Sequence, residues 1–494
     1  MKATDRMAWN RRSSRYEPVL PRSSEKEKQG YSTATKPSFQ VPARALVKVA
    51  RIVLIVVGVV LLILVLIRRS TEGSEATQPT RAVSYFKSQW SSSSRKTPTS
   101  DSPAGWAIKV AEAILPDART STAQWEQERL IDLAKIIECR ANNNCTNKQK
   151  HVVISGVGRW KWSLDETFER PAFFPNGEAV LGKSWISTIK EMGYPFIHIA
   201  DYWGGDDSVR TISRLYRAIG DNVAAVLLDY VAERVCMRED PLCKQSEENP
   251  EGIPEWKIFQ WDPLGAVPEP KYREPWGLKS FPIWPGAKVT YVGFEMESSC
   301  KGIPFTPPDK REKMIYVFGK EKHYFDPAKN HNAWSNETYQ RIIQETGLRI
   351  EAGILDNDPE ANIPEGVTNV GTETRGDFMR RIAKARLLLG TGLPHESPTP
   401  MEGLCAGTPF VNMELNPGWH QHPMLAREAP PYVYSVPARD EDKLLAAVHE
   451  ALAHPLDKPF LPELATKASF MGRLEKLIEG DWKTRWETAK LEDA

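Results

Sequence analysis

ARLLLGTGLPHESPTPMEGLCAGTPFVN, residues 385–412, is the most informative part of this sequence. Its apolar run Leu387–Leu389 has the length and composition of a buried parallel strand. The run stops at Gly390-Thr391-Gly392, where the chain can turn with a positive φ at little cost. Pro400 suits the first residue of a short helix over 401–405, and 409–412 is typical of the next strand. This strand–loop–helix–strand unit aims backbone N–H groups and the positive end of a helix at one point, which suits a phosphate.

Two carboxylates lie on this loop and in the first turn of the expected helix. Glu396 and Glu402 can accept hydrogen bonds from sugar or ribose hydroxyls. By pattern alone, an ordinary βα crossover with surface acids explains the stretch as well as a nucleotide site does.

The stretch also resembles the donor-binding loop of glycosyltransferase family 18, the N-acetylglucosaminyltransferase V-like enzymes. That loop has the pattern G-x-G-x-P-x-E-x-P-x-P-x-E-x-x-x-x-G-x-x-F-x-N. Its fixed positions are all met here, by Gly390, Gly392, Pro394, Glu396, Pro398, Pro400, Glu402, Gly407, Phe410 and Asn412. YVGFE at 291–295 and VFGK at 317–320 also look like strands and turns of the family, and the resemblance covers roughly residues 150–480.

The resemblance implies a GT-B fold, with two Rossmann-like domains facing a cleft. It implies an inverting enzyme that transfers N-acetylglucosamine from UDP-N-acetylglucosamine to a mannose of an N-glycan in β-1,6 linkage. The N-terminal half is shorter than the family's, which bears on the acceptor more than on the donor. The runner-up expectations are a GT-B transferase of another nucleotide sugar or acceptor, and a non-catalytic membrane-tethered glycan-binding protein. A soluble dehydrogenase-like Rossmann protein comes third.

Charge and hydropathy divide the 494 residues into an N-terminal tail, an apolar segment, a polar stem and a larger remainder. Lys and Arg number 65 and Asp and Glu 64, a net of +1 that argues against a general nucleic-acid binder. Residues 1–44 are expected to be a disordered basic cytosolic tail, and 45–69 a transmembrane signal anchor built on the apolar run Ile52–Ile67. The basic lead predicts a type II orientation, with residues 70–104 as a Ser/Thr-rich stem. We therefore expect a single-pass Golgi membrane protein with a lumenal catalytic part.

Alternating strand and helix patterns fill the rest of the chain and predict an α/β class with parallel sheets. Residues 105–150 are expected to form a helical neck, 151–288 an N-terminal Rossmann-like acceptor domain, and 289–494 a C-terminal nucleotide-sugar-binding domain. Residues 236–288, dense in Pro and Trp, are expected to be an irregular connector along the cleft, with most of the tryptophans simply packed.

The cysteine spacing suggests an oxidising lumen. Cys139/Cys145 and Cys236/Cys243 are close enough to form short-loop disulfides, and no C-x-x-C pair points to zinc. Cys405 is expected to be a small apolar core residue.

Sugar transfer from a nucleotide needs positive charge at the departing diphosphate and contacts to the nucleoside and sugar. Gly319 and Lys320, at the end of an expected strand, offer backbone N–H groups and one cation. A solvated loop lysine is the ordinary alternative for Lys320. In the donor loop we expect contacts from Gly392, Pro398 and Pro400, together with the two glutamates. By resemblance Glu402 would hold the ribose, whereas Glu396 could instead rigidify the loop.

The reaction also needs a base to deprotonate the acceptor hydroxyl. In the family a glutamate of a Gly-Glu pair just ahead of a Trp-bearing helix has this role, and Gly177-Glu178 ahead of Trp185 resembles it. Glu178 is therefore the expected base. The alternatives are Asp165, Glu166 and Asp229, and a surface glutamate at a helix start is the ordinary reading.

No metal or other cofactor is expected, because backbone groups, a helix end and Lys320 can stabilise the diphosphate. Asp356-Asn357-Asp358 is like a D-x-D metal motif but lies in a Pro/Asn-rich segment typical of a turn. His420-Gln421-His422 has no third clustered ligand and is expected to be a cleft loop over the donor base.

Overall fold

A computed structural model describes residues 103–165, 177–199, 206–263, 267–280, 288–355, 358 and 360–493, all within one compact unit, Thr99–Ala494. The expected tail 1–44, the anchor 45–69 and nearly all of the stem 70–104 lie outside these residues. None of the helices described is long and apolar enough to cross a membrane.

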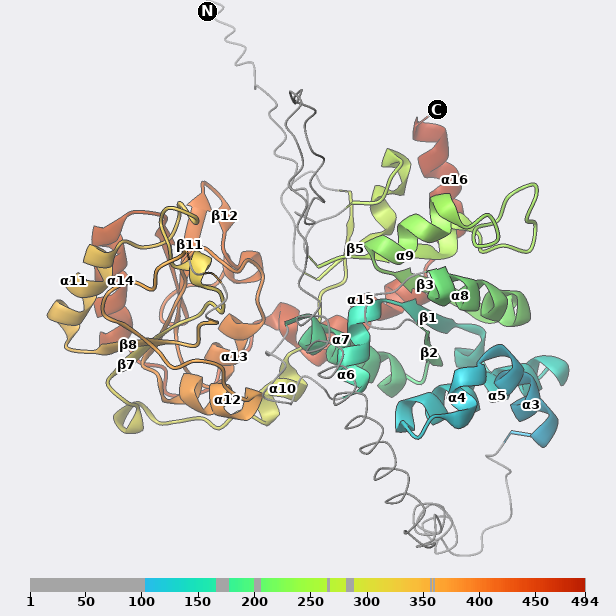
Figure 1. The fold of residues 1–494 in the computed structure, drawn as a ribbon, viewed down its shortest axis with the longest axis horizontal. Coiled ribbons are helices and arrows are strands. Elements are labelled where there is room, and N and C mark those ends of the chain that lie inside the picture. Colours follow the sequence, from blue (N-terminus) through green and yellow to red (C-terminus); the bar gives the residue numbers. More distant parts are fainter. Residues whose placement is uncertain are drawn as a thin grey trace, which may run out of the picture. The chain divides into compact units, whose positions relative to one another are not determined.

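Among the described residues, six strands form the first sheet in the order β2-β1-β3-β4-β5-β6, and each neighbouring pair is parallel (Figure 1). The strands are β1 Val152–Gly156, β2 Phe196–His198, β3 Val223–Leu228, β4 Ile258–Trp261, β5 Gly277–Lys279 and β6 Thr290–Tyr291. The helices before β6 are α3 Gly105–Ile114, α4 Pro116–Thr120, α5 Gln124–Ala141, α6 Lys161–Leu164, α7 Gly177–Glu191, α8 Asp206–Ile219 and α9 Tyr230–Arg234.

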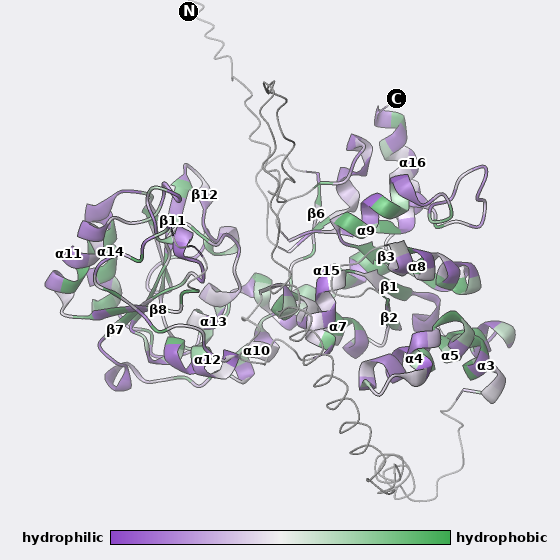
Figure 2. Cartoon of the chain, viewed as in Figure 1, coloured by the Kyte–Doolittle hydropathy of each residue, from purple (hydrophilic) through white to green (hydrophobic). Residues whose placement is uncertain are grey.

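Helices cover both faces of this sheet, because alternate residues of one strand join different cores. Val152 and Ile154 of β1 belong to a cluster with α3, α5 and α8, whereas Val153 belongs to a cluster with α7. This period of two is what a strand buried on both faces requires. Figure 2 shows β1, β2 and β3 mainly in the hydrophobic colour, whereas helices such as α4 and α8 carry hydrophilic and hydrophobic residues together. The helical spacing of the neck is confirmed by α3 and α5.

The second sheet is parallel except for the hairpin partner β12. Its strands are β7 Met314–Val317, β8 Arg349–Ala352, β9 Val367–Asn369, β10 Leu387–Leu389, β11 Phe410–Asn416, β12 Trp419–His420 and β13 Val433–Pro437. The parallel strands lie in the order β13-β11-β10-β7-β8-β9, so the winding direction reverses between β7 and β10. In open α/β sheets, ligands bind at such a switch point, outside the carboxyl ends of the strands.

Several helices belong to this half of the fold. They are α10 Glu297–Lys301, α11 Asn336–Thr346, α12 Arg375–Lys384, α13 Thr399–Cys405 and α14 Glu441–Ala453. The Ser335 hydroxyl accepts a hydrogen bond from the Thr338 N–H and so caps α11, while Gly347 ends the helix at φ +65°. The α/β class with parallel sheets is confirmed.

Two expectations about the chain path are wrong. The 236–288 segment is not merely irregular, because β4 and β5 lie within it and extend the first sheet. Thr290–Tyr291 was expected to open the second domain, but it pairs with β5 as the last strand of the first sheet. These strands are only two to four residues long and are flanked by prolines, so their pattern is too short to show a period.

The C-terminal helices α15 Lys467–Ile478 and α16 Trp482–Asp493 also join the first half of the fold. The ring centroid of Trp482 lies 4.8 Å from that of Phe259 on β4 and 5.5 Å from that of Trp276. Trp261 and Trp276 are buried, which confirms the packing role expected for them. Residues 467–493 therefore pack with the first sheet, although they follow the second in the chain.

Three disulfides join the cysteines. Cys139–Cys145 and Cys236–Cys243 are the two short loops that the spacing predicts. The expectation that Cys405 is an ordinary core residue is wrong, because it pairs with Cys300 and ties α13 to α10. These two cysteines are 105 positions apart in the chain, so their spacing gave no signal of a pair.

Candidate functional site

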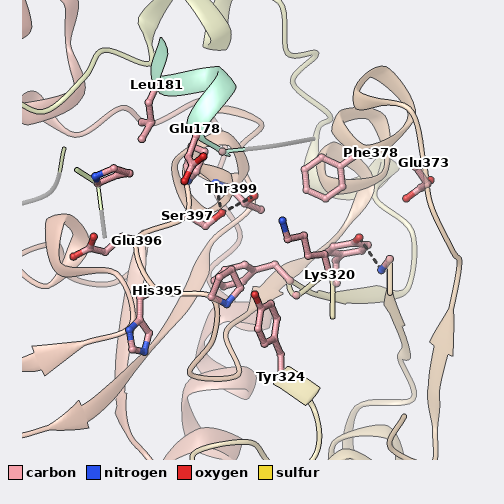
Figure 3. Close-up of a pocket in the computed structure, with 18 of the residues that line it drawn as sticks. Glu178, Leu181, Lys320, Tyr324, Glu373, Phe378, His395, Glu396, Ser397 and Thr399 are labelled. Carbon is pink, nitrogen blue, oxygen red and sulfur yellow. Dashed lines mark hydrogen bonds between the residues drawn. The ribbon is translucent and has the colours of Figure 1, made fainter. Parts of the chain in front are cut away.

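A cavity of about 340 Å³ lies where loops of the two sheets meet (Figure 3). One wall consists of residues that follow the carboxyl ends of β7, β8, β9 and β10, around the switch point of the second sheet. The other wall comes from the first half of the fold and includes Arg159 after β1, Glu178 and Leu181 on α7, and Pro263 after β4. The carboxyl ends of strands from both sheets thus point toward the cavity, and this is the edge of a sheet at which α/β proteins bind ligands.

Lys320 supplies a cation to this cavity. It follows β7 by three residues, and its carbonyl oxygen accepts a 2.7 Å hydrogen bond from the Leu355 N–H, which fixes the turn. Figure 3 shows its side chain projecting into the cavity. No ion pair of Lys320 is present in the described part of the chain. Together with the adjacent Gly319, which also lines the cavity, it can receive an anionic group.

The loop that follows β10 crosses the floor of the cavity through residues 394–399. Gly392 makes the turn before it at φ +85°, where an added Cβ would lie 2.9 Å from the Asn332 side chain. Glu396 is itself left-handed at φ +58°, and its N–H donates to the Gln421 carbonyl over 3.1 Å. A non-glycine residue held in this region is uncommon and points to a position constrained by its surroundings.

The Glu396 carboxyl lies in an unusual electrostatic setting. The pKa of Glu396 is raised to about 8, chiefly by burial; Lys279 opposes the increase and Asp262 adds to it. Asp262 directly follows β4, and the Lys279 ammonium donates to its carbonyl oxygen over 3.1 Å. Glu396 is therefore mainly protonated at neutral pH and can donate a hydrogen bond to a ligand oxygen.

Glu178 lies in the first turn of α7, on the wall facing Lys320. Its carboxylate is paired with Arg159, and its side chain is only 12% exposed. Burial raises the pKa of Glu178, while Arg159 and Lys320 act to lower it. A carboxylate at a helix start whose pKa is displaced toward neutrality is suited to accept a proton.

Five of the expected site residues therefore line one cavity: Glu178, Gly319, Lys320, Glu396 and Pro398. Gly392, Pro400 and Glu402 do not line it. Gly392 shapes the turn and Pro400 is buried in α13. Glu402 is 1% exposed, and its carboxylate is paired with Arg375 at the start of α12.

The alternative bases have other surroundings. Asp229 caps α9 by accepting from the Ala232 N–H over 2.9 Å, and it also accepts from Gly158. Asp165 accepts from the Trp125 indole over 2.8 Å. Neither lines the cavity, and Glu166 lies outside the described residues.

The cavity has further lining residues that the sequence patterns did not single out. They are aromatic or charged and include Arg159, Tyr316, Tyr324, Glu373 and Phe378. Arg159 and Glu373 follow the carboxyl ends of β1 and β9. That position after a strand was the signal that could have found them.

Of the suspected metal motifs, Asp356 lies outside the described residues, and Asp358 pairs with Lys329 at 2.7 Å. His422 is buried, and burial lowers its pKa to about 4. Within the described ranges no three His, Cys, Asp or Glu side chains are grouped to hold a metal ion. Metal independence stays a prediction.

Residues 279–485 match the model of glycosyltransferase family 18, which confirms the resemblance over this region. The human alpha-1,6-mannosylglycoprotein 6-beta-N-acetylglucosaminyltransferase A is 23% identical over 273 residues, covering 46% of this chain and 35% of the relative. The human B enzyme of the same name is 24% identical over 238 residues, covering 42% and 29%. The chain thus spans about a third of the length of the curated relatives it matches.

Among solved structures, AviGT4, a glycosyltransferase involved in avilamycin A biosynthesis, is similar with a TM-score of 0.34 at 12% identity. The match covers 69% of this chain and 96% of that chain. A score this low does not bear on activity.

Proposed function

We propose that this chain, whose residues 279–485 match glycosyltransferase family 18, transfers N-acetylglucosamine from UDP-N-acetylglucosamine to a mannose of a glycoprotein glycan. The names of the relatives support the sugar and the acceptor class. The observation that carries the proposal is that Glu178 and Lys320, from the two halves of the fold, line one cavity at a switch point. In this proposal the two sheets form a GT-B arrangement.

The donor lies along the loops that follow β7 to β10. Its diphosphate is near the Lys320 ammonium, which is close enough to Glu178 to lower the pKa of that carboxyl. As the bond to UDP breaks, negative charge grows on the departing phosphate oxygen, and a fixed cation in a partly enclosed site stabilises it.

Glu178 acts as the base from the other wall. It removes the proton of the acceptor hydroxyl while that oxygen forms a bond to the anomeric carbon and the bond from that carbon to the UDP oxygen breaks. The attack comes from the side opposite the leaving group, so the configuration inverts and the linkage is β, in this proposal to the 6-hydroxyl. Arg159 holds the Glu178 carboxylate in position through their ion pair.

The two loop glutamates have different roles in this proposal. Glu396, protonated at neutral pH, donates a hydrogen bond to a donor oxygen from the cavity floor. Glu402 fixes α13 through Arg375, and a contact with the ribose requires its carboxylate to leave that partner.

The reaction is proposed to need no metal ion, and the site to be lumenal, held to a Golgi membrane by the anchor expected over 45–69. The anchor and location rest on the sequence alone.

The test measures UDP or GDP release by the purified full chain with a panel of nucleotide sugars and an N-glycan acceptor, with and without a chelator. The proposal expects acceptor-dependent release from UDP-N-acetylglucosamine that survives chelation, with N-acetylglucosamine added to the acceptor by mass spectrometry. Release only from another donor would overturn the assigned sugar, and loss on chelation would overturn metal independence. No turnover with any donor would favour a non-catalytic glycan-binding protein.

A further inference from the structure

A second pocket, of about 250 Å³, lies away from the proposed active site. Its lining comes from the segment before β7, from Arg386 and from the end of α14, and consists of Pro308, Asp309, Arg311, Arg386, Ala451, Leu452 and Pro455. Arg311 precedes β7 by three residues, and Arg386 directly precedes β10. Since β7 and β10 are parallel neighbours, both arginines lie at the amino edge of the sheet, opposite the edge that carries Lys320.

Arg311 is a buried cation that forms no ion pair with the described residues, and its guanidinium carbon lies 5.7 Å from the centroid of the Phe305 ring. It is 5% exposed, and its Nε donates to the Thr306 carbonyl over 2.9 Å. Its two terminal nitrogens, Nη1 and Nη2, are buried, and no described residue accepts from them. Burial lowers the pKa of Arg311 to about 10.

The fold leaves room for this guanidinium. Gly407 turns the chain after α13 at φ +82°, and an added Cβ would lie 2.6 Å from the Arg311 Nη2 and 2.4 Å from the Phe305 ring. A side chain at position 407 would therefore displace the arginine. The absence of a side chain at Gly407 thus leaves room for the Arg311 guanidinium, for which the described residues provide no counter-ion.

Arg386 adds a second positive charge to the same pocket. Its Nε is also buried and has no acceptor in the described part of the chain. The one acidic residue of the lining, Asp309, has a side chain that is 69% exposed and lies 3.4 Å from Lys310. Arg311 and Arg386 thus both line this small pocket, and no described carboxylate pairs with either of them.

We propose that this pocket binds an oxyanion of the phosphate type. A buried charge is costly unless it is paired and hydrogen-bonded, and a planar guanidinium fork matches the oxygens of phosphate or sulfate. The anion bound here is distinct from the donor diphosphate, because it enters at the other edge of the sheet. The competing explanation is that carbonyl groups at the end of α14, beside Ala451 and Leu452, stabilise the arginines without any ligand.

Thermal unfolding of the full chain, titrated with inorganic phosphate against sodium chloride at constant ionic strength, tests the proposal. Phosphate is expected to raise the Tm of the natural protein more than chloride does, and methyl phosphate shows whether a phosphate ester is accepted as well as the free ion. Arg311→Met is expected to abolish the shift. Its Tm without phosphate should equal or exceed that of the natural protein, because an unpaired buried charge is removed.

Lys320→Ala is the control, because it removes the cation of the other cavity and should keep the phosphate shift. Arg386→Met is a second variant that should also lose the rise in Tm caused by phosphate. It tests the proposal if Arg311→Met does not fold. A natural protein that phosphate stabilises no more than chloride would overturn the proposal. So would a shift that survives in both arginine variants.

Discussion

Glu178 is the residue on which the proposed chemistry depends. Glu178→Gln keeps the shape of the side chain but cannot accept a proton at neutral pH. We expect kcat to fall by about 10²- to 10⁴-fold while KM for the nucleotide sugar changes little. Steady-state kinetics and the Tm of the variant measure the two effects.

Asp229→Asn provides the matched control, since Asp229 was an alternative base but caps α9. It is expected to retain kcat and to lose about 1 kcal/mol of stability at most. Full activity of Glu178→Gln would show that Glu178 is not the base. An inactive but stable Asp229→Asn variant would assign the role of base to Asp229.

Glu396 predicts a pH dependence whose sign follows from its raised pKa. A carboxyl that folding makes harder to ionise contributes stability below its unfolded pKa, and that contribution is lost as the pH rises through its folded pKa of about 8. Glu396→Gln removes the ionisation. The difference in Tm between the variant and the natural protein should therefore increase as the pH rises from about 5 to about 8. These limits correspond to the pKa values of Glu396 in the unfolded and the folded protein, and the difference should level off above pH 8.

Donor affinity should follow the same ionisation, because only the protonated carboxyl donates a hydrogen bond. The Kd for UDP-N-acetylglucosamine is expected to rise above pH 8 in the natural protein and to stay flat in Glu396→Gln. Equal pH profiles for the two proteins would contradict a protonated Glu396 at the donor.

Residue roles were foreseen unevenly. The family-like loop identified Glu396, the strand and glycine–lysine turn at 317–320 identified Lys320, and a Gly-Glu pair identified Glu178; all three line the cavity. Arg159 and Asp262, which act on the pKa of Glu178, follow strands in the less similar half and carry no motif. The position of each residue after a strand can be predicted, but its contact with Glu178 cannot be read from one sequence.

The Arg375–Glu402 pair joins the start of α12 to the first turn of α13. Glu402→Gln leaves the Arg375 guanidinium, whose side chain is 15% exposed, without its counter-charge. Removing one partner of a buried pair costs about 3–5 kcal/mol, so unfolding by denaturant should show a loss of that order.

A double-mutant cycle with Arg375→Met separates the two possible roles of Glu402. If Glu402 is structural, the double variant recovers part of the lost stability. A Glu402→Gln variant of unchanged stability but raised donor KM would instead assign it to the ribose.

Long elements with caps were predictable and short ones were not. Ser335 and Gly347 bound α11 as their residue types indicate. In contrast β5 and β6 have three and two residues, too few for any periodicity, and only their neighbours in the sheet make them strands.

At the scale of the whole molecule, the last two helices return to the first sheet. Trp482 on α16 is 5% exposed and packs on Phe259 and Trp276, and its indole donates to the Leu477 carbonyl over 2.8 Å. Trp482→Ala should lower the free energy of unfolding by about 3–5 kcal/mol. Trp106→Ala is the control, since that side chain is 48% exposed, and it should change stability by about 0.5 kcal/mol or less.

This return explains why sequence order misleads about the two halves. The amphipathic pattern of 463–479 predicts a helix but not the sheet that it covers, because an apolar face fits any complementary surface. The partners of Trp482 lie more than 200 residues earlier in the chain.

Lys320 and the loops around it are proposed to hold a nucleotide diphosphate. The most direct measurement is the Kd of UDP by calorimetry for the natural protein, for Lys320→Ala, and for Lys443→Ala, whose side chain is 66% exposed on α14. We predict that UDP binds the natural protein and the Lys443 variant equally, and that Lys320→Ala weakens binding by about tenfold or more. Equal UDP affinity in all three proteins, or no UDP binding by the natural protein, would contradict the account.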